Sequence, residues 1–145
     1  MDIMELMDSL DNFKIVNSNT LKYNGDKYTN YAIYGNEKEA LPLVEDFFKD
    51  NDTNYIIVDL NDEQDLNRDL ITLAKELVEK KAVLILKGFG NVDNLKRNRF
   101  STIYKDLSIN GAKIRYLGTI AFMDKNIYSL DLDEEIVFKK IRWVI

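Results

Sequence analysis

Two continuously apolar stretches, separated by an amphipathic segment of helix length, constrain the fold of this chain most strongly. The stretches are YIIVDL at Tyr55–Leu60 and AVLIL at Ala82–Leu86. Short apolar runs without polar alternation are typical of strands covered on both faces. Between them, from about Asp62 to Lys80, leucines recur at helical spacing, with acidic residues early and lysines late, as the helix dipole favours. The pattern predicts a β-α-β unit with parallel strands.

The same alternation extends to both sides of this unit. Upstream we expect an amphipathic helix at 3–16, a β-hairpin over Leu21–Tyr34 that turns at Asn24-Gly25, a strand at Tyr31–Tyr34 and a helix with Leu41, Val44 and Phe47 or Phe48 on one face. Downstream we expect a helix capped by Asp93 with Leu95, Ile103 and Leu107 inward, a strand at Ile114–Phe122, a short turn or helix near Leu132–Val137 and a last strand at Lys140–Ile145.

Repeated β-α-β units predict an α/β fold, namely a mainly parallel, doubly wound sheet with helices on both faces. We expect one domain over residues 1–145, in which 1–30 form the N-terminal helix and hairpin and 31–145 form the α/β core. The residues expected in the core include Ile57, Leu70, Leu73, Leu77, Leu84 and Ile120.

The composition excludes several kinds of catalysis. The chain has no cysteine and no histidine. Disulfides, thiolate nucleophiles, Ser-His-Asp and Cys-His catalysis and His-ligated zinc are therefore absent. No other sequence signature of an enzyme appears, and we predict no cofactor, no metal and no catalytic residue.

The charge and hydropathy of the chain bear on its partners and location. The formal net charge is -5, which argues against general nucleic-acid binding. The first residues alternate apolar and acidic types without the pattern of a signal peptide, and the apolar runs are too short to span a bilayer. We therefore expect a cytoplasmic protein that makes no membrane contact.

The segment after Tyr34 is spaced like a phosphate-binding loop. Gly35, four residues, Ala40, Leu41 and Pro42 occupy the places of G-x-x-x-x-G-K-[ST] between a strand and a helix. Over residues 30–145 the order of elements resembles a P-loop ATPase core of the AAA+ type. The resemblance implies a degenerate, catalytically dead scaffold, because the second glycine, the phosphate lysine and the hydroxyl are missing. Lys87 and Gly88 stand where that family has its Walker B acids.

Two acidic sets are candidate metal ligands. Asp59, Asp62, Glu63 and Asp65 follow an expected strand, where Mg²⁺ sites occur, but they also suit a helix N-terminus. The second set, Asp131, Asp133, Glu134 and Glu135, is like another helix start. Read with Glu37, its D-x-D pattern is similar to Toprim-type sites, although a polar segment, Asp124–Ser129, separates it from the preceding strand.

Three features are candidates for partner binding. Lys96, Arg97 and Arg99 gather cations in the first turns of an expected helix, where they are either a docking site or a solvated face. Phe89 lies between two glycines and either serves as an exposed anchor or folds back over the sheet. The apolar last strand, with Arg142 and Trp143, either pairs inside the sheet or offers an edge to another chain.

These features support one hypothesis most directly and leave two alternatives. The first is a non-catalytic α/β module that acts through protein–protein contacts, as a subunit or accessory factor of a larger assembly or as a homo-oligomer. The second is a Mg²⁺-dependent nucleotide-binding protein or enzyme that uses Asp59 and Asp62. The third is a nucleic-acid accessory protein that uses the basic run from Lys96 to Arg99.

Overall fold

The computed structural model describes residues 13–17, 30–50, 52–104, 108–109, 112–113, 118–123 and 138–143. The large sheet contains the strands β1 (Phe13–Asn17), β2 (Asn30–Tyr34), β3 (Tyr55–Asp59), β4 (Val83–Lys87), β7 (Gly118–Met123) and β8 (Lys139–Trp143), and a small sheet pairs β5 (Ser108–Ile109) with β6 (Ala112–Lys113). The helical elements are α2 (Glu37–Asp50), α3 (Glu63–Leu66), α4 (Leu70–Glu79), the 3₁₀ turn η2 (Phe89–Asn91), α5 (Asn94–Asn98) and α6 (Ser101–Tyr104).

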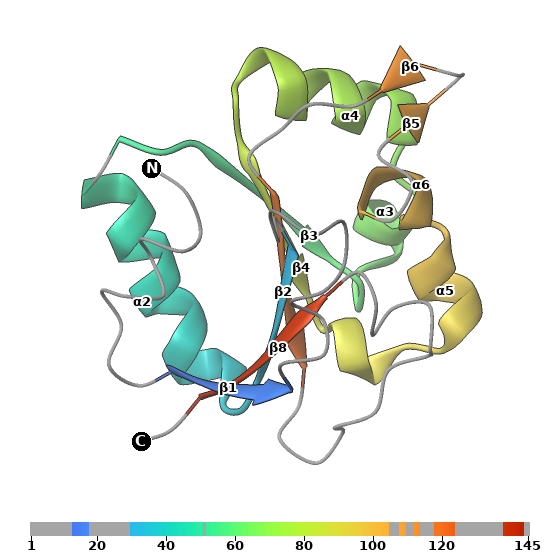
Figure 1. The fold of residues 1–145 in the computed structure, drawn as a ribbon. Helices are drawn as coiled ribbons and strands as arrows, with labels where there is room; N and C mark the ends of the chain where they lie inside the picture. Colours follow the sequence, from blue (N-terminus) through green and yellow to red (C-terminus); the bar gives the residue numbers. More distant parts are fainter. Residues whose placement is uncertain are drawn as a thin grey trace.

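The large sheet is mainly parallel, which confirms the predicted α/β class. Its strands lie in the order β1-β8-β2-β7-β4-β3, and the pairs β8–β2, β2–β7, β7–β4 and β4–β3 are all parallel. Only β1 runs antiparallel, against β8. Helix α2 covers one face, whereas α3, α4, α5 and α6 lie on the other (Figure 1). The order of the parallel strands differs from the usual dinucleotide-binding and flavodoxin-like orders.

Strands β2 and β7 are enclosed in the centre of the sheet, and every residue of both is buried. Strand β2 bears on the predicted hairpin. All five of its residues are buried, and it pairs on one side with β7 and on the other with β8. The hairpin predicted over Leu21–Tyr34 is therefore wrong in its second half, because no side of β2 is left for an antiparallel partner. Residues 21–29 lie outside the described residues. The helix predicted at 3–16 is also wrong at its end, since residues 13–17 form β1.

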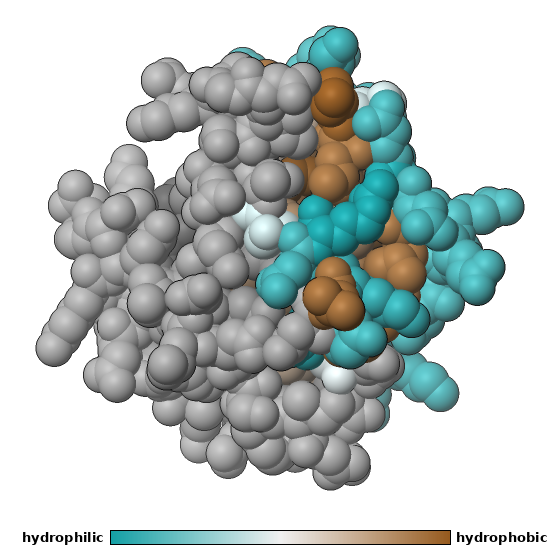
Figure 2. All heavy atoms as spheres, turned by 90° about the vertical axis from the view of Figure 1, so that its right-hand side faces the viewer, coloured by the Kyte–Doolittle hydropathy of each residue, from teal (hydrophilic) through white to brown (hydrophobic). Residues whose placement is uncertain are grey.

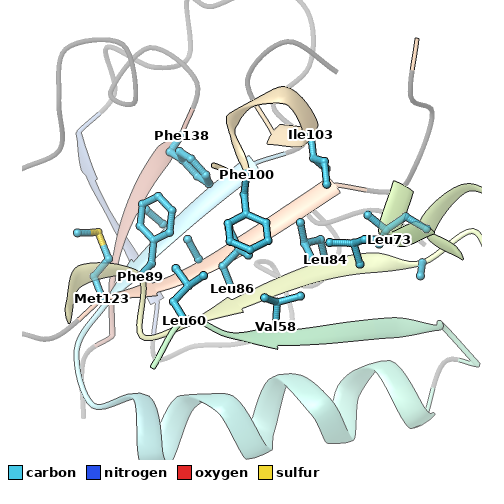
Figure 3. Close-up of a cluster of buried hydrophobic side chains, with 14 of the residues drawn as sticks. Val58, Leu60, Leu73, Leu84, Leu86, Phe89, Phe100, Ile103, Met123 and Phe138 are labelled. Carbon is cyan, nitrogen blue, oxygen red and sulfur yellow. The ribbon is translucent and has the colours of Figure 1, made fainter. Parts of the chain in front are cut away.

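The helices pack on the sheet through two apolar clusters. On the α2 side, Val44 and Phe48 meet strand residues that include Ile85 and Ile120. On the other side, Leu73 and Leu77 of α4 belong to the cluster that also contains Leu84 and the aromatic rings of Phe89, Phe100 and Phe138 (Figure 3). Of the predicted core, Leu73, Leu77, Leu84 and Ile120 are buried, while Ile57 and Leu70 are partly buried.

The helix predicted from Asp62 to Lys80 is two helices. Asp62 caps α3 by accepting the Gln64 N–H at 2.8 Å, and Asp69 caps α4 by accepting the Ile71 N–H at 3.0 Å. A second capping aspartate within the segment lets the chain end one helix and start another. The turn and helix predicted near Leu132–Val137, and Ile114–Leu117 of the predicted strand, lie outside the described residues. No helix in the described ranges is long and apolar enough to cross a membrane.

Because Asp69 caps α4, the free energy of unfolding should depend on pH in a way that can be measured. Hydrogen bonds from the Thr72 hydroxyl and the Ile71 amide lower the pKa of Asp69 below its ordinary value of 3.8. A lowered folded-state pKa stabilises the fold above that ordinary value, and the effect is lost as the pH falls through the lowered pKa. Asp69→Ala should therefore reduce the free energy of unfolding at neutral pH, and its difference from the wild type should shrink in acid. Asp69→Asn, which caps without titrating, is the control in urea unfolding at several pH values. A deficit of Asp69→Ala that stays constant with pH would contradict this reading.

Candidate interaction surface beyond the carboxyl ends of the parallel strands

The carboxyl ends of the parallel strands lie at one end of the sheet, where α/β folds bind their ligands. Backbone hydrogen bonds join the loops at this end of the sheet. The Gly35 N–H donates to the Met123 carbonyl at 3.2 Å, and the Leu60 N–H donates to the Lys87 carbonyl at 2.9 Å. The loops therefore continue the strand pairing for one residue before the chain turns away.

The segment that resembles a phosphate-binding loop is mostly helical. Helix α2 begins at Glu37, so only Gly35 and Asn36 separate it from β2. Asn36 caps the helix, since its side-chain oxygen accepts the Lys38 N–H at 3.1 Å. Pro42 is exposed and lies inside the helix rather than in a loop. That Gly35–Pro42 does not cradle a triphosphate stays a prediction. A second reason supports it, because the amides of Lys38, Glu39 and Ala40 already donate to oxygens of Asn36.

A carboxylate of α2 accepts a hydrogen bond from the backbone directly after β4. The Gly88 N–H donates to Glu37 Oε1 at 2.9 Å in a partly buried contact. Gly88 has a φ of 72°, and a Cβ built there would lie 2.4 Å from Asn61 Nδ2. The glycine is therefore needed for backbone conformation and for the close approach of the β3 and β4 loops. The sequence suggested Glu37 only as a metal ligand. No local pattern indicates its contact with the Gly88 N–H.

The acidic residues after β3 serve as backbone acceptors. Asp59 Oδ1 accepts the Asn61 N–H at 2.9 Å, and Asp65 Oδ2 accepts the Asp59 N–H at 3.0 Å. Asp62 caps α3. Among the described residues, no group of three or more acidic side chains is placed to hold a metal ion. Asp131, Asp133, Glu134 and Glu135 lie outside the described residues.

Phe89 folds back over the sheet and is fully buried. Its ring lies 5.5 Å from that of Phe138, and the Arg97 guanidinium lies 5.4 Å above it (Figure 3 shows Phe89 and Phe138). The prediction of Phe89 as a partner anchor is therefore wrong. The turn η2 directs the ring inward, where it joins the cluster under α5 and α6.

Arg97 is buried as well, with only 8% of its surface exposed. Its Nη1 lies 3.4 Å from the Phe89 carbonyl and 3.3 Å from the Val92 carbonyl, and donates to both. The prediction of Arg97 as a partner-binding cation is therefore wrong, because its charge faces backbone carbonyls and an aromatic ring. The residue instead fixes α5 on η2.

Two residues near Arg97 face solvent, since Lys96 is exposed and Leu95 is 83% exposed. Arg99 is partly exposed; its Nη1 is buried and its guanidinium lies 5.6 Å from the centroid of the Phe100 ring. The inward position predicted for Leu95 is wrong, since α5 is only five residues long and turns Arg97 toward the core. Figure 2 shows the side of the molecule that carries α3 to α6, where hydrophobic areas interrupt a mainly hydrophilic surface. We call Leu95, Lys96 and Arg99 the α5 surface.

The last strand is not an open edge. Strand β8, which contains Arg142 and Trp143, lies between β1 and β2 and pairs with both. The sequence left two readings open, and the structure has the one in which the strand pairs inside the sheet. Within the part of the predicted interaction region whose side chains the structure describes, the α5 surface is exposed to solvent.

A shallow hollow of about 420 Å³ lies at the opposite end of the sheet, where β3 begins. It is lined by Phe48, Lys49, Asp52, Thr53, Asn54 and Tyr55. Burial raises the pKa of the Tyr55 hydroxyl, and the Glu45 carboxylate, which accepts its hydrogen bond at 3.2 Å, raises it further. The hollow lies at the amino end of β3, away from the usual ligand position of such sheets.

We found no family model, no curated protein and no solved structure that matches this chain.

Neighbouring cations on α5 should differ sharply in their effect on stability. Arg97→Ala removes a buried guanidinium and its hydrogen bonds to the Phe89 and Val92 carbonyls, so the free energy of unfolding should fall by about 1–3 kcal/mol. Lys96→Ala changes an exposed side chain and should stay within about 0.5 kcal/mol of the wild type. Urea unfolding monitored by circular dichroism measures both. Equal effects of the two substitutions would show that Arg97 is not buried.

Gly88→Ala tests the conformation at the end of β4. An alanine at this positive φ should cost about 1–2 kcal/mol of folding free energy. Asn61→Ala in the same background removes the side chain that the new methyl group would meet, so it should relieve the steric part of the loss but not the backbone part. Equal stability of Gly88→Ala and the wild type in urea unfolding would contradict the left-handed turn.

Proposed function

We propose that this chain is a non-catalytic α/β module that acts through protein–protein contacts, as a subunit or accessory factor of a larger assembly. The observation that supports it best is the α5 surface. Leu95 is far more exposed than any other large hydrophobic residue of the described chain, since the others reach only 41%. Lys96 follows it on the same short helix, and Arg99 lies at the C-cap of that helix.

The α5 surface has the properties of a preformed contact site. Burying an exposed leucine against a partner is worth about 1.5–3 kcal/mol. Because Arg97 fixes α5 on η2 and Asp93 caps it by accepting the Lys96 N–H at 3.0 Å, little backbone conformational entropy is lost on binding. Leu95 and Arg99 are four residues apart, which places them on the same face of the helix. An apolar group beside cations suits a hydrophobic contact with an acidic rim.

We also propose that the α/β core is a degenerate P-loop scaffold of the AAA+ type. Its support is topological. Strands β2, β3, β4 and β7, which the resemblance aligns in chain order, lie in one parallel sheet, with β2 enclosed between two neighbours. The lost lysine and hydroxyl positions, Leu41 and Pro42, argue for a structural role rather than hydrolysis.

The two alternative functions have less support. Asp59 and Asp62, which a Mg²⁺ site would use, already accept backbone N–H groups. The basic run offers nucleic acid only Lys96 and Arg99, because Arg97 is buried, and the chain as a whole is acidic. A protein partner therefore accounts better for an exposed leucine beside these cations.

Charge reversal on α5 tests this function. Lys96→Glu with Arg99→Glu should abolish recovery of the partner in a pull-down from the native source, since the surface would then repel an acidic rim. Lys38→Glu with Lys75→Glu makes the same charge change on exposed sites of α2 and α4 and should leave recovery unchanged. Circular dichroism confirms folding of both variants. Undiminished recovery with the α5 variant would refute the proposal.

A further inference from the structure

The charges of this chain are segregated along its sequence. Residues 94–105 contain Lys96, Arg97, Arg99 and Lys105 and no acidic residue. Residues 1–12, which lie outside the described residues, contain Asp2, Glu5, Asp8 and Asp11 and no basic residue. We call residues 1–12 the acidic segment. The basic stretch is therefore complementary in charge to the acidic segment of a second copy.

The acidic segment also matches the apolar part of the α5 surface. Ile3, Leu6 or Met7, and Leu10 recur at helical spacing, with carboxylates between them. An amphipathic segment of this kind can place a leucine or isoleucine against Leu95 and carboxylates against Lys96 and Arg99. Leu95 stays 83% exposed within its own chain, which leaves it open to another.

We propose that the α5 surface binds the acidic segment of a second copy of this chain. The proposal rests on the function proposed above and names its partner. Reciprocal exchange gives a two-fold symmetric dimer, in which each copy supplies one acidic segment and one α5 surface. Because the contact pairs carboxylates with Lys96 and Arg99, it should weaken as salt is added.

Sedimentation equilibrium of the full chain measures the dimer dissociation constant. The wild type should dimerise at low salt. Lys96→Glu with Arg99→Glu should raise the dissociation constant at least about tenfold, and so should Asp8→Lys with Asp11→Lys. The four substitutions together restore opposite charges and should recover most of the affinity, as coupled positions do. Lys38→Glu with Lys75→Glu is the matched control and should leave the constant unchanged.

A second measurement uses the unmodified chain. Carbodiimide joins a lysine amine to a carboxylate in direct contact, so mixed ¹⁵N-labelled and unlabelled chains should yield a Lys96 cross-link to the acidic segment between labelled and unlabelled copies. A monomeric wild type, a dimer indifferent to both charge reversals, failure of the fourfold variant to recover affinity, or cross-links confined to one copy would each overturn the proposal. If the chain is monomeric and the α5 variant still loses a partner in the pull-down, the proposed function stands and only this inference fails.

Discussion

The described fold depends on two central strands, β2 and β7, that are fully buried and paired on both sides. Strand β2 is buried on both faces and hydrogen-bonded on both sides, to β7 and to β8. Because β2 is central, the chain must cross over the sheet to reach each neighbour, and the helices of those crossovers cover both faces. The same arrangement brings the ends of β2 and β4 together, so that Glu37 of α2 reaches the Gly88 amide. Enclosure of these central strands therefore determines the layers and the geometry of the carboxyl end.

The region after β4 positions α5 and its exposed residues on the sheet. Gly88 turns the chain in a left-handed conformation, and Phe89 then enters the cluster that also holds Phe138, just before β8. Arg97 covers the Phe89 ring and fixes α5. A cation that looked like a binding residue is thereby used for packing, and its neighbours become the exposed ones. The exposure of Leu95 is a consequence of the burial of Arg97 on a helix of only five residues.

The sequence was sufficient for the parallel strands, because AVLIL is wholly apolar and YIIVDL is apolar except for Asp59. It overstated the burial of β3, which is an edge strand with only Val58 of its five residues buried. It was also sufficient for α2 and for the cap at Asp93, which are local patterns. The sequence did not predict correctly those features, such as strand pairing and side-chain burial, that depend on tertiary contacts. The Asn24-Gly25 pattern indicated a hairpin onto Tyr31–Tyr34, yet both sides of β2 are taken by strands distant in sequence. Leu95 was assigned inward by its hydrophobicity, although the burial of Arg97 depends on a ring eight residues earlier. One signal was available: Phe89 between two glycines needs a cover, and a nearby arginine can supply it.

We infer that the buried contact between Phe89 and Arg97 fixes α5 and leaves Leu95 exposed to solvent. Hydroxyl-radical footprinting of the native chain, read by mass spectrometry and normalised to the chain in urea, tests it in one measurement. We expect Phe89 to be strongly protected from oxidation. Leu95, six residues away in the same segment, should be oxidised at nearly the rate of the unfolded chain. Oxidation of Phe89 at the rate of the unfolded chain, with Leu95 protected, would contradict it.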